Sequence, residues 1–153
     1  VYAVRGRGSA LLAIKTGASG AADGDALAWR LNEACPDEAT PLLYRGKLFV
    51  LDGAGKKMTC VDAATGTRVW QGRLGGGATW YASPTGADGK IYCLSDRGET
   101  LVLSAGPSFE ILSRGRLEPD PGSSRASIAI AGGKLFIRTE KTLFCAGVRA
   151  ETR

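Results

Sequence analysis

The chain has 153 residues, the size of one folded domain, with 44% hydrophobic and 23% charged residues, as in an ordinary globular protein. Its formal net charge of +5 comes from scattered Lys and Arg residues without a long basic run, which argues against nucleic-acid binding. Because the chain has no histidine, it cannot build a Ser-His-Asp or Cys-His catalytic arrangement by itself, and no apolar run approaches the roughly 20 residues that span a bilayer.

Short strands and tight turns are predicted from the start of the chain. Residues 1–4 read as a strand and open a first unit of about residues 1–31, with a Gly/Ala/Asp-rich insertion around residues 18–25. A second unit of about residues 40–74 is divided more clearly by its turn residues. Its predicted strands are 40–44, 47–51, 56–62 and 67–74. Glycine recurs at intervals too short for helices, so the chain is predicted to be all-β.

One segment of the second unit is repeated twice further along the sequence. The stretch from Gly46 to Leu51 is matched after 43 residues by Gly89 to Leu94, and after a further 44 by Gly133 to Arg138. A period of forty-odd residues with four short strands is that of a β-propeller blade. We therefore predict an all-β partial β-propeller of four-stranded antiparallel blades, two full and two incomplete, in a single domain of residues 1–153. The blades fall at about residues 1–31, 40–74, 83–117 and 126–147.

The stretch from Cys60 to Trp70 resembles the tryptophan-docking motif of the pyrroloquinoline-quinone-like (PQQ-like) β-propeller repeat family. The matching residues are Asp62, Thr65, Gly66 and Trp70. In such a motif the Asp and Thr side chains close a turn, Gly takes a positive φ and Trp packs between blades. These roles are structural. The resemblance extends over essentially the whole chain and is nearest to the C-terminal portion of bacterial outer-membrane assembly lipoprotein propellers.

The other units match this motif less well. The first keeps Thr16 and Gly17 with a displaced Trp29, but has Lys15 where Asp is expected. The third carries residues 103–111 without Asp, Thr or Trp in register, and the fourth stops soon after residues 143–147. We therefore expect the blades to share a backbone and to differ in how they pack.

Quinoprotein alcohol dehydrogenases share this repeat, and the resemblance implies for them adjacent cysteines, a catalytic Asp, calcium ligands and a Trp floor. The four cysteines here lie far apart, and Asp37 with Glu38 forms a single acidic pair. They are Cys35, Cys60, Cys93 and Cys145. Cys60 and Cys145 occupy the same strand position two units apart, too distant for a disulfide. We expect no cofactor, no metal and no catalytic residue in this chain.

A binding site is expected at the rim of the central channel, where the loops before the innermost strands converge. Counting one repeat back and one forward from Tyr81 gives Glu38 and Arg125, with Trp80 beside Tyr81. An acid, aromatic rings and a cation at a concave rim could bind a peptide or a carbohydrate. The same residues could equally line a water-filled channel mouth, since polar rims are ordinary on protein surfaces.

The repeats do not complete a ring, because propellers close with four to eight blades. The chain is therefore interpreted as a fragment of a longer protein, completed by further blades or by self-association. The leading hypothesis is a non-catalytic scaffold of a secreted or periplasmic bacterial protein that binds a protein or polymer partner, with no nucleic acid and no membrane span. The alternative is part of a quinone- or metal-dependent oxidoreductase whose active-site residues lie in other blades.

Overall fold

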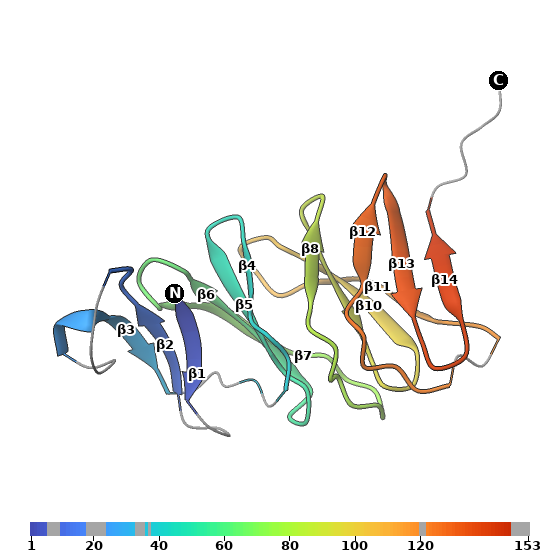
Figure 1. The fold of residues 1–153 in the computed structure, drawn as a ribbon, viewed down its shortest axis with the longest axis horizontal. Coiled ribbons are helices and arrows are strands. Elements are labelled where there is room, and N and C mark those ends of the chain that lie inside the picture. Colours follow the sequence, from blue (N-terminus) through green and yellow to red (C-terminus); the bar gives the residue numbers. More distant parts are fainter. Residues whose placement is uncertain (6–9, 18–23, 33–35, 37, 120–121, 148–153) are drawn as a thin grey trace.

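A computed structural model describes residues 1–5, 10–17, 24–32, 36, 38–119 and 122–147. Within these residues the chain forms strands β1 to β14 and one short 3₁₀ turn, η1 (Gly24–Ala26). Figure 1 shows the strands gathered into separate small sheets that stand side by side in chain order. No helix of the described chain is long and apolar enough to cross a membrane.

Each sheet is antiparallel, and its strands pair in the order in which they occur in the sequence. The first sheet contains β1 (Tyr2–Arg5), β2 (Ala10–Ile14) and β3 (Leu27–Leu31). The second contains β4 (Leu42–Tyr44), β5 (Lys47–Asp52), β6 (Lys57–Asp62) and β7 (Arg68–Arg73). The third contains β8 (Thr85–Ala87), β9 (Lys90–Leu94), β10 (Glu99–Ser104) and β11 (Ile111–Arg116). The fourth contains β12 (Ala129–Ala131), β13 (Lys134–Arg138) and β14 (Leu143–Ala146).

Two four-stranded sheets flanked by two three-stranded sheets confirm the predicted partial β-propeller. We call the sheets blades one to four. In the second blade the predicted strands agree with the observed ones to within two residues at each end. The first blade has no counterpart of β4 and the fourth has none of β7 among the described residues.

The continuous apolar run of β5 is explained by burial on both faces of its blade. Successive side chains of a strand point to opposite faces. Accordingly, Phe49 and Leu51 belong to the core shared with the third blade, whereas Leu48 and Val50 belong to the core shared with the first. All four side chains are at most 1% exposed.

The turn between β6 and β7 is closed by the side chains that the motif supplies. The Asp62 carboxylate accepts hydrogen bonds from the Ala64 N–H (3.0 Å), the Thr65 N–H (2.9 Å) and the Thr65 hydroxyl (3.0 Å). Gly66 follows with a φ of 74°. A Cβ at Gly66 would lie 2.6 Å from the Trp29 ring, so this position must also stay small to let the indole of the first blade pack on the turn.

Two tryptophans, Trp29 and Trp70, each dock on the turn of the next blade. Trp29 Nε1 donates to the Ala63 carbonyl at 3.0 Å, and Trp70 Nε1 donates to the Gly106 carbonyl at 3.2 Å. The displaced Trp29 of the first unit therefore takes the same role as Trp70. In the third blade the Ser104 hydroxyl accepts from the Gly106 N–H at 3.1 Å, replacing the Asp of the motif with a neutral acceptor. The motif alone did not predict this turn, because it has Asp at the position where the third blade has Ser104.

Candidate functional site

The rim consists of the loops that lead into β4, β8 and β12, which lie at the lower edge of the molecule in Figure 1. Hydrogen bonds join neighbouring blades beside the rim. The Thr40 N–H donates to Ser83 Oγ at 2.8 Å, and Thr85 Oγ1 donates to the Ile128 carbonyl at 2.7 Å. These bonds link the second blade to the third and the third to the fourth next to the rim loops.

Glu38, Tyr81 and Arg125 meet at this rim. Arg125 Nη1 lies 3.8 Å from Glu38 Oε2, and the Arg125 Cζ lies 4.5 Å from the centre of the Tyr81 ring. The Arg125 side chain is 68% exposed and that of Glu38 is 42% exposed. We call these three residues the rim trio. It joins one residue from each of three successive blades, as the repeat spacing predicts.

The rim trio contributes little to the stability of the fold. An exposed ion pair is worth about 0–1 kcal/mol, and an exposed cation–π contact about 0.5–1 kcal/mol. The same features suit recognition, because the trio offers a carboxylate, a guanidinium and an aromatic face to solvent at one place. A shallow cavity of about 300 Å³ borders Glu38 and extends the site toward Tyr2 and Val4 of the first blade.

Trp80 does not take part in this exposed group. Its side chain is 1% exposed and packs in the core between the second and third blades, and its indole N–H has no hydrogen-bond partner among the described residues. From Ala78 to Ala82 the residues alternate between buried and partly exposed. Adjacent residues of an extended segment point to opposite sides, so Trp80 faces the core while Tyr81 faces the rim. The sequence contained this alternation, and the rim prediction did not use it.

The described residues do not supply the set of groups that a quinone site requires. No two cysteines are adjacent in the sequence. No group of three or more His, Cys, Asp and Glu side chains comes together within the described ranges. Cys35 and Asp37 lie outside the described residues. The part of the chain that the structure describes therefore does not fit such a cofactor.

Three of the cysteines are free thiols in distinct environments. Cys60 and Cys93 are buried, and Cys145 is exposed. Burial raises the pKa of the Cys60 thiol to about 11 and that of Cys93 to about 12. A thiol with so high a pKa is almost wholly protonated at neutral pH and is a poor nucleophile or metal ligand.

Stacked antiparallel blades with exposed side chains converging at one rim define the chain as part of a β-propeller. Residues 17–150 match a family model described as outer membrane protein assembly factor BamB. The chain therefore belongs to this family of PQQ-like β-propellers. No curated protein matches the sequence significantly.

Solved structures of two functional kinds resemble the fold. BamB from Moraxella catarrhalis superposes with a TM-score of 0.60 at 19% identity, and the match covers 91% of this chain and 43% of the BamB chain. Quinohemoprotein alcohol dehydrogenase ADHIIG from Pseudomonas putida HK5 superposes with a TM-score of 0.66 at 20% identity, and the match covers 89% of this chain and 26% of the dehydrogenase. A europium-containing methanol dehydrogenase superposes with a TM-score of 0.61 at 13% identity, and the match covers 77% of this chain and 23% of that enzyme. The chain thus spans less than half the length of each, and the likeness shows the fold alone.

Proposed function

We propose that this chain is a non-catalytic binding module that presents the rim trio of Glu38, Tyr81 and Arg125 to a protein or polymer partner. The observation that carries the proposal is the convergence of the exposed Glu38 and Arg125 with the half-buried Tyr81 from three successive blades. Aromatic and Arg side chains are the residues most often responsible for binding energy at protein interfaces. Glu38 would orient the guanidinium of Arg125, and the Tyr81 ring would supply apolar area.

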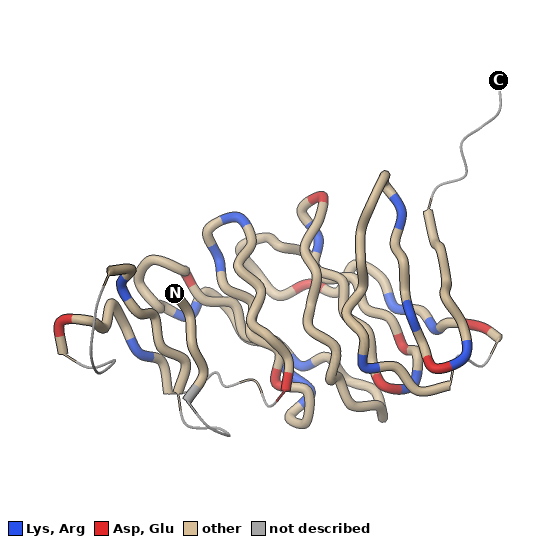
Figure 2. Tube along the Cα trace, viewed as in Figure 1, with Lys and Arg blue, Asp and Glu red and all other residues tan. Residues whose placement is uncertain are grey.

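The family supports a protein partner, because its description names an outer-membrane assembly factor. We propose a periplasmic or secreted location on the same ground. Figure 2 shows Lys and Arg distributed over several strands and turns and interspersed with Asp and Glu, rather than gathered on one face. This distribution does not favour a nucleic acid as the partner. We propose that the four blades act as one domain, and that further blades or a second copy complete the ring.

The alternative function is a contribution to a quinone-dependent oxidoreductase. It is supported by the likeness of the fold to two dehydrogenases. The proposed binding role is preferred because the described residues offer neither adjacent cysteines nor a cluster of acidic ligands.

The test uses the purified chain with two defined probes, a library of displayed random peptides and an array of bacterial polysaccharides. Binders selected on the wild-type chain are measured again on Tyr81→Ala and Arg125→Ala. Each substitution is expected to weaken binding by about tenfold or more, because each removes a side chain at the centre of the site. Arg45→Ala is the matched control, since Arg45 is an exposed cation that also contacts a tyrosine ring, that of Tyr44, but lies in the turn between β4 and β5, at the opposite end of β4 from the rim loops.

Equal loss of binding in the Arg45→Ala control would show that net charge, rather than the rim trio, is recognised. A second measurement addresses the alternative function. If pyrroloquinoline quinone with Ca²⁺ binds the chain with one-to-one stoichiometry and a change in absorbance, the non-catalytic proposal is overturned.

A further inference from the structure

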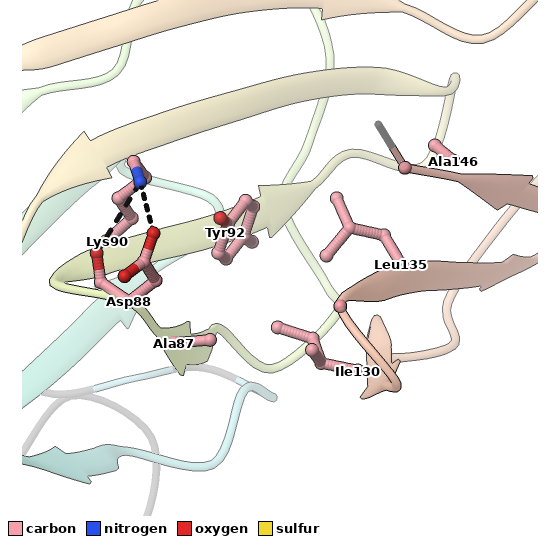
Figure 3. Close-up of a pocket in the computed structure, with 9 residues that line it drawn as sticks. Ala87, Asp88, Lys90, Tyr92, Ile130, Leu135 and Ala146 are labelled. Atoms are coloured by element: carbon pink, nitrogen blue, oxygen red, sulfur yellow. Dashed lines mark hydrogen bonds and ion pairs between the residues drawn. The ribbon is translucent and has the colours of Figure 1, made fainter. Parts of the chain in front are cut away.

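A cavity of about 500 Å³ lies between the third and fourth blades. Figure 3 shows it enclosed by side chains from both blades, with Tyr92 of β9 facing Leu135 of β13 and Ile130 of β12. Ala87 and Ala146 complete its apolar wall. It borders the turns that join β8 to β9 and β12 to β13, at the opposite ends of β8 and β12 from the rim loops. The cavity is therefore a separate site from the rim trio.

The preceding interface shows what fills the equivalent space. Between the second and third blades, Tyr44 stands at the position that Ala87 occupies one repeat later. The Tyr44 hydroxyl accepts a hydrogen bond from the Gly89 N–H at 2.9 Å, in the turn of the next blade. The Tyr44 ring also lies against Gly86, where a Cβ would come within 2.8 Å of it. Ala87 has no ring, so the phenol of this interface has no counterpart in the following one.

The hydrogen-bond donor that would meet such a phenol is retained. Gly133 is equivalent to Gly89, has a similar φ of 70° and lines the cavity. Its N–H has no partner within the described part of the chain. The Tyr92 hydroxyl likewise has none among the described residues. The Lys90 ammonium stands at the edge of the cavity, where it is bonded to the Asp88 carboxylate at 2.8 Å.

We propose that this cavity binds a phenol. Its oxygen accepts a hydrogen bond from the Gly133 N–H, and its ring packs against Tyr92, Leu135 and Ile130. Its volume lies within the roughly 300–1,000 Å³ of small-molecule sites, which combine apolar walls with a few polar groups. Because Ile130 replaces Gly86, the ring lies beside the Ile130 side chain rather than directly on the main chain. The phenol can come from a free small molecule or from a tyrosine side chain of a peptide.

The experiment titrates the 153-residue chain with p-cresol and follows the amide resonances of residues 87–92 and 130–135 by NMR. A ligand of this size is expected to bind with a Kd on the order of 0.1–1 mM. Toluene, which has the ring but no hydroxyl, is expected to bind about three- to tenfold more weakly because it leaves the Gly133 N–H unpaired. Equal affinity for toluene would overturn the assignment of the hydroxyl.

Substitutions locate the binding. Ala87→Phe places a ring where the second blade carries Tyr44, and is expected to weaken p-cresol binding at least about tenfold by occupying the space. Ala146→Phe fills the cavity from the other side and serves if the first variant does not fold. Ala131→Phe is the matched control, because Ala131 is an exposed residue of β12 that does not line the cavity. Unchanged binding in both filled variants, with both folded, would place the ligand elsewhere and refute the site.

A last arm distinguishes the two sources of the phenol. A short peptide with a central tyrosine is compared with the same peptide carrying alanine there. Tighter binding of the tyrosine peptide than of p-cresol would assign the cavity to a polypeptide, and weaker binding would assign it to a free phenol. Failure of p-cresol and both peptides to shift the cavity resonances would overturn the proposal and leave the rim function untouched.

Discussion

The interface between the second and third blades and the interface between the third and fourth share one backbone plan and differ in how they are filled. The core between the second and third blades contains thirteen buried residues, whereas the core between the third and fourth contains four. Trp70 contributes to this difference, since its ring contacts Phe49 at 5.8 Å and Phe109 at 5.5 Å between centroids. By register, Ser113 of β11 stands at the equivalent position of the third blade.

Hydrogen bonds across the two interfaces differ in the same direction. In the tight interface Lys47 Nζ donates to the carbonyls of Ala105 (3.2 Å) and Gly106 (3.0 Å) of the next blade. Its counterpart Lys90 donates within its own hairpin, to Asp88. Repeat spacing therefore sets where blades lie, while a few aromatic and cationic side chains set how firmly they are joined.

The largest expected effect is that of truncating Trp70. Trp70→Ala should destabilise the chain by about 3–5 kcal/mol, because it removes a buried aromatic ring and leaves a cavity. Ser113→Ala, at the equivalent exposed position, should change stability by less than about 0.5 kcal/mol. Urea denaturation followed by circular dichroism measures both. Similar losses in the two variants would contradict the difference between the interfaces.

Thiol labelling compares the same regions through their cysteines. In a Cys35→Ser background, Cys145 should react readily with a thiol reagent at neutral pH. Cys60 and Cys93 should react at least about 100-fold more slowly, since a rise of the Cys60 pKa from 9.0 to about 11 alone reduces its thiolate that much. Both should become reactive in denaturant. Fast labelling of Cys93 in the native chain would show that the tight interface opens.

A smaller effect is expected from removing one hydroxyl. Tyr44→Phe leaves the Gly89 N–H without its partner and should cost about 1 kcal/mol. The matched change is Tyr92→Phe in the third blade, where the hydroxyl has no partner among the described residues. We expect that variant to be nearly neutral. Thermal denaturation distinguishes the two, and a larger loss from Tyr92→Phe would reverse the comparison.

The smallest effect concerns pH. Hydrogen bonds from the Thr65 main chain and side chain hold the pKa of Asp62 below its ordinary value of 3.8. Since its pKa is lower in the folded state, Asp62 stabilises the fold above pH 3.8, and this contribution is lost as pH falls through the folded pKa. Ser104 closes the corresponding turn of the third blade without a charge. Asp62→Ser should therefore lose less stability than the wild type on acidification, as measured by urea midpoints at about pH 6 and about pH 3.

Much of the fold could be predicted because its signals are local. The repeated Gly-Lys-apolar segment gave the strand positions, and the Asp62 to Trp70 motif gave the turn and the docking ring. The third-blade turn was harder to recognise, because Ser104 provides the same acceptor with different chemistry. The convergence of Glu38, Tyr81 and Arg125 followed from register, since equivalent positions of adjacent blades lie side by side. The burial of Trp80 required attention to alternation, which the rim prediction did not apply.

The amino-acid sequence by itself determined the period, the strands and the tight turns, because these depend on neighbouring residues along one chain. Only the tertiary structure decided which spaces between blades are filled, because packing depends on the combined volumes of side chains from different repeats. Trp70 packs between Phe49 and Phe109, whereas the cavity beside Tyr92 is not filled by a side chain. Neither outcome can be read from one repeat alone.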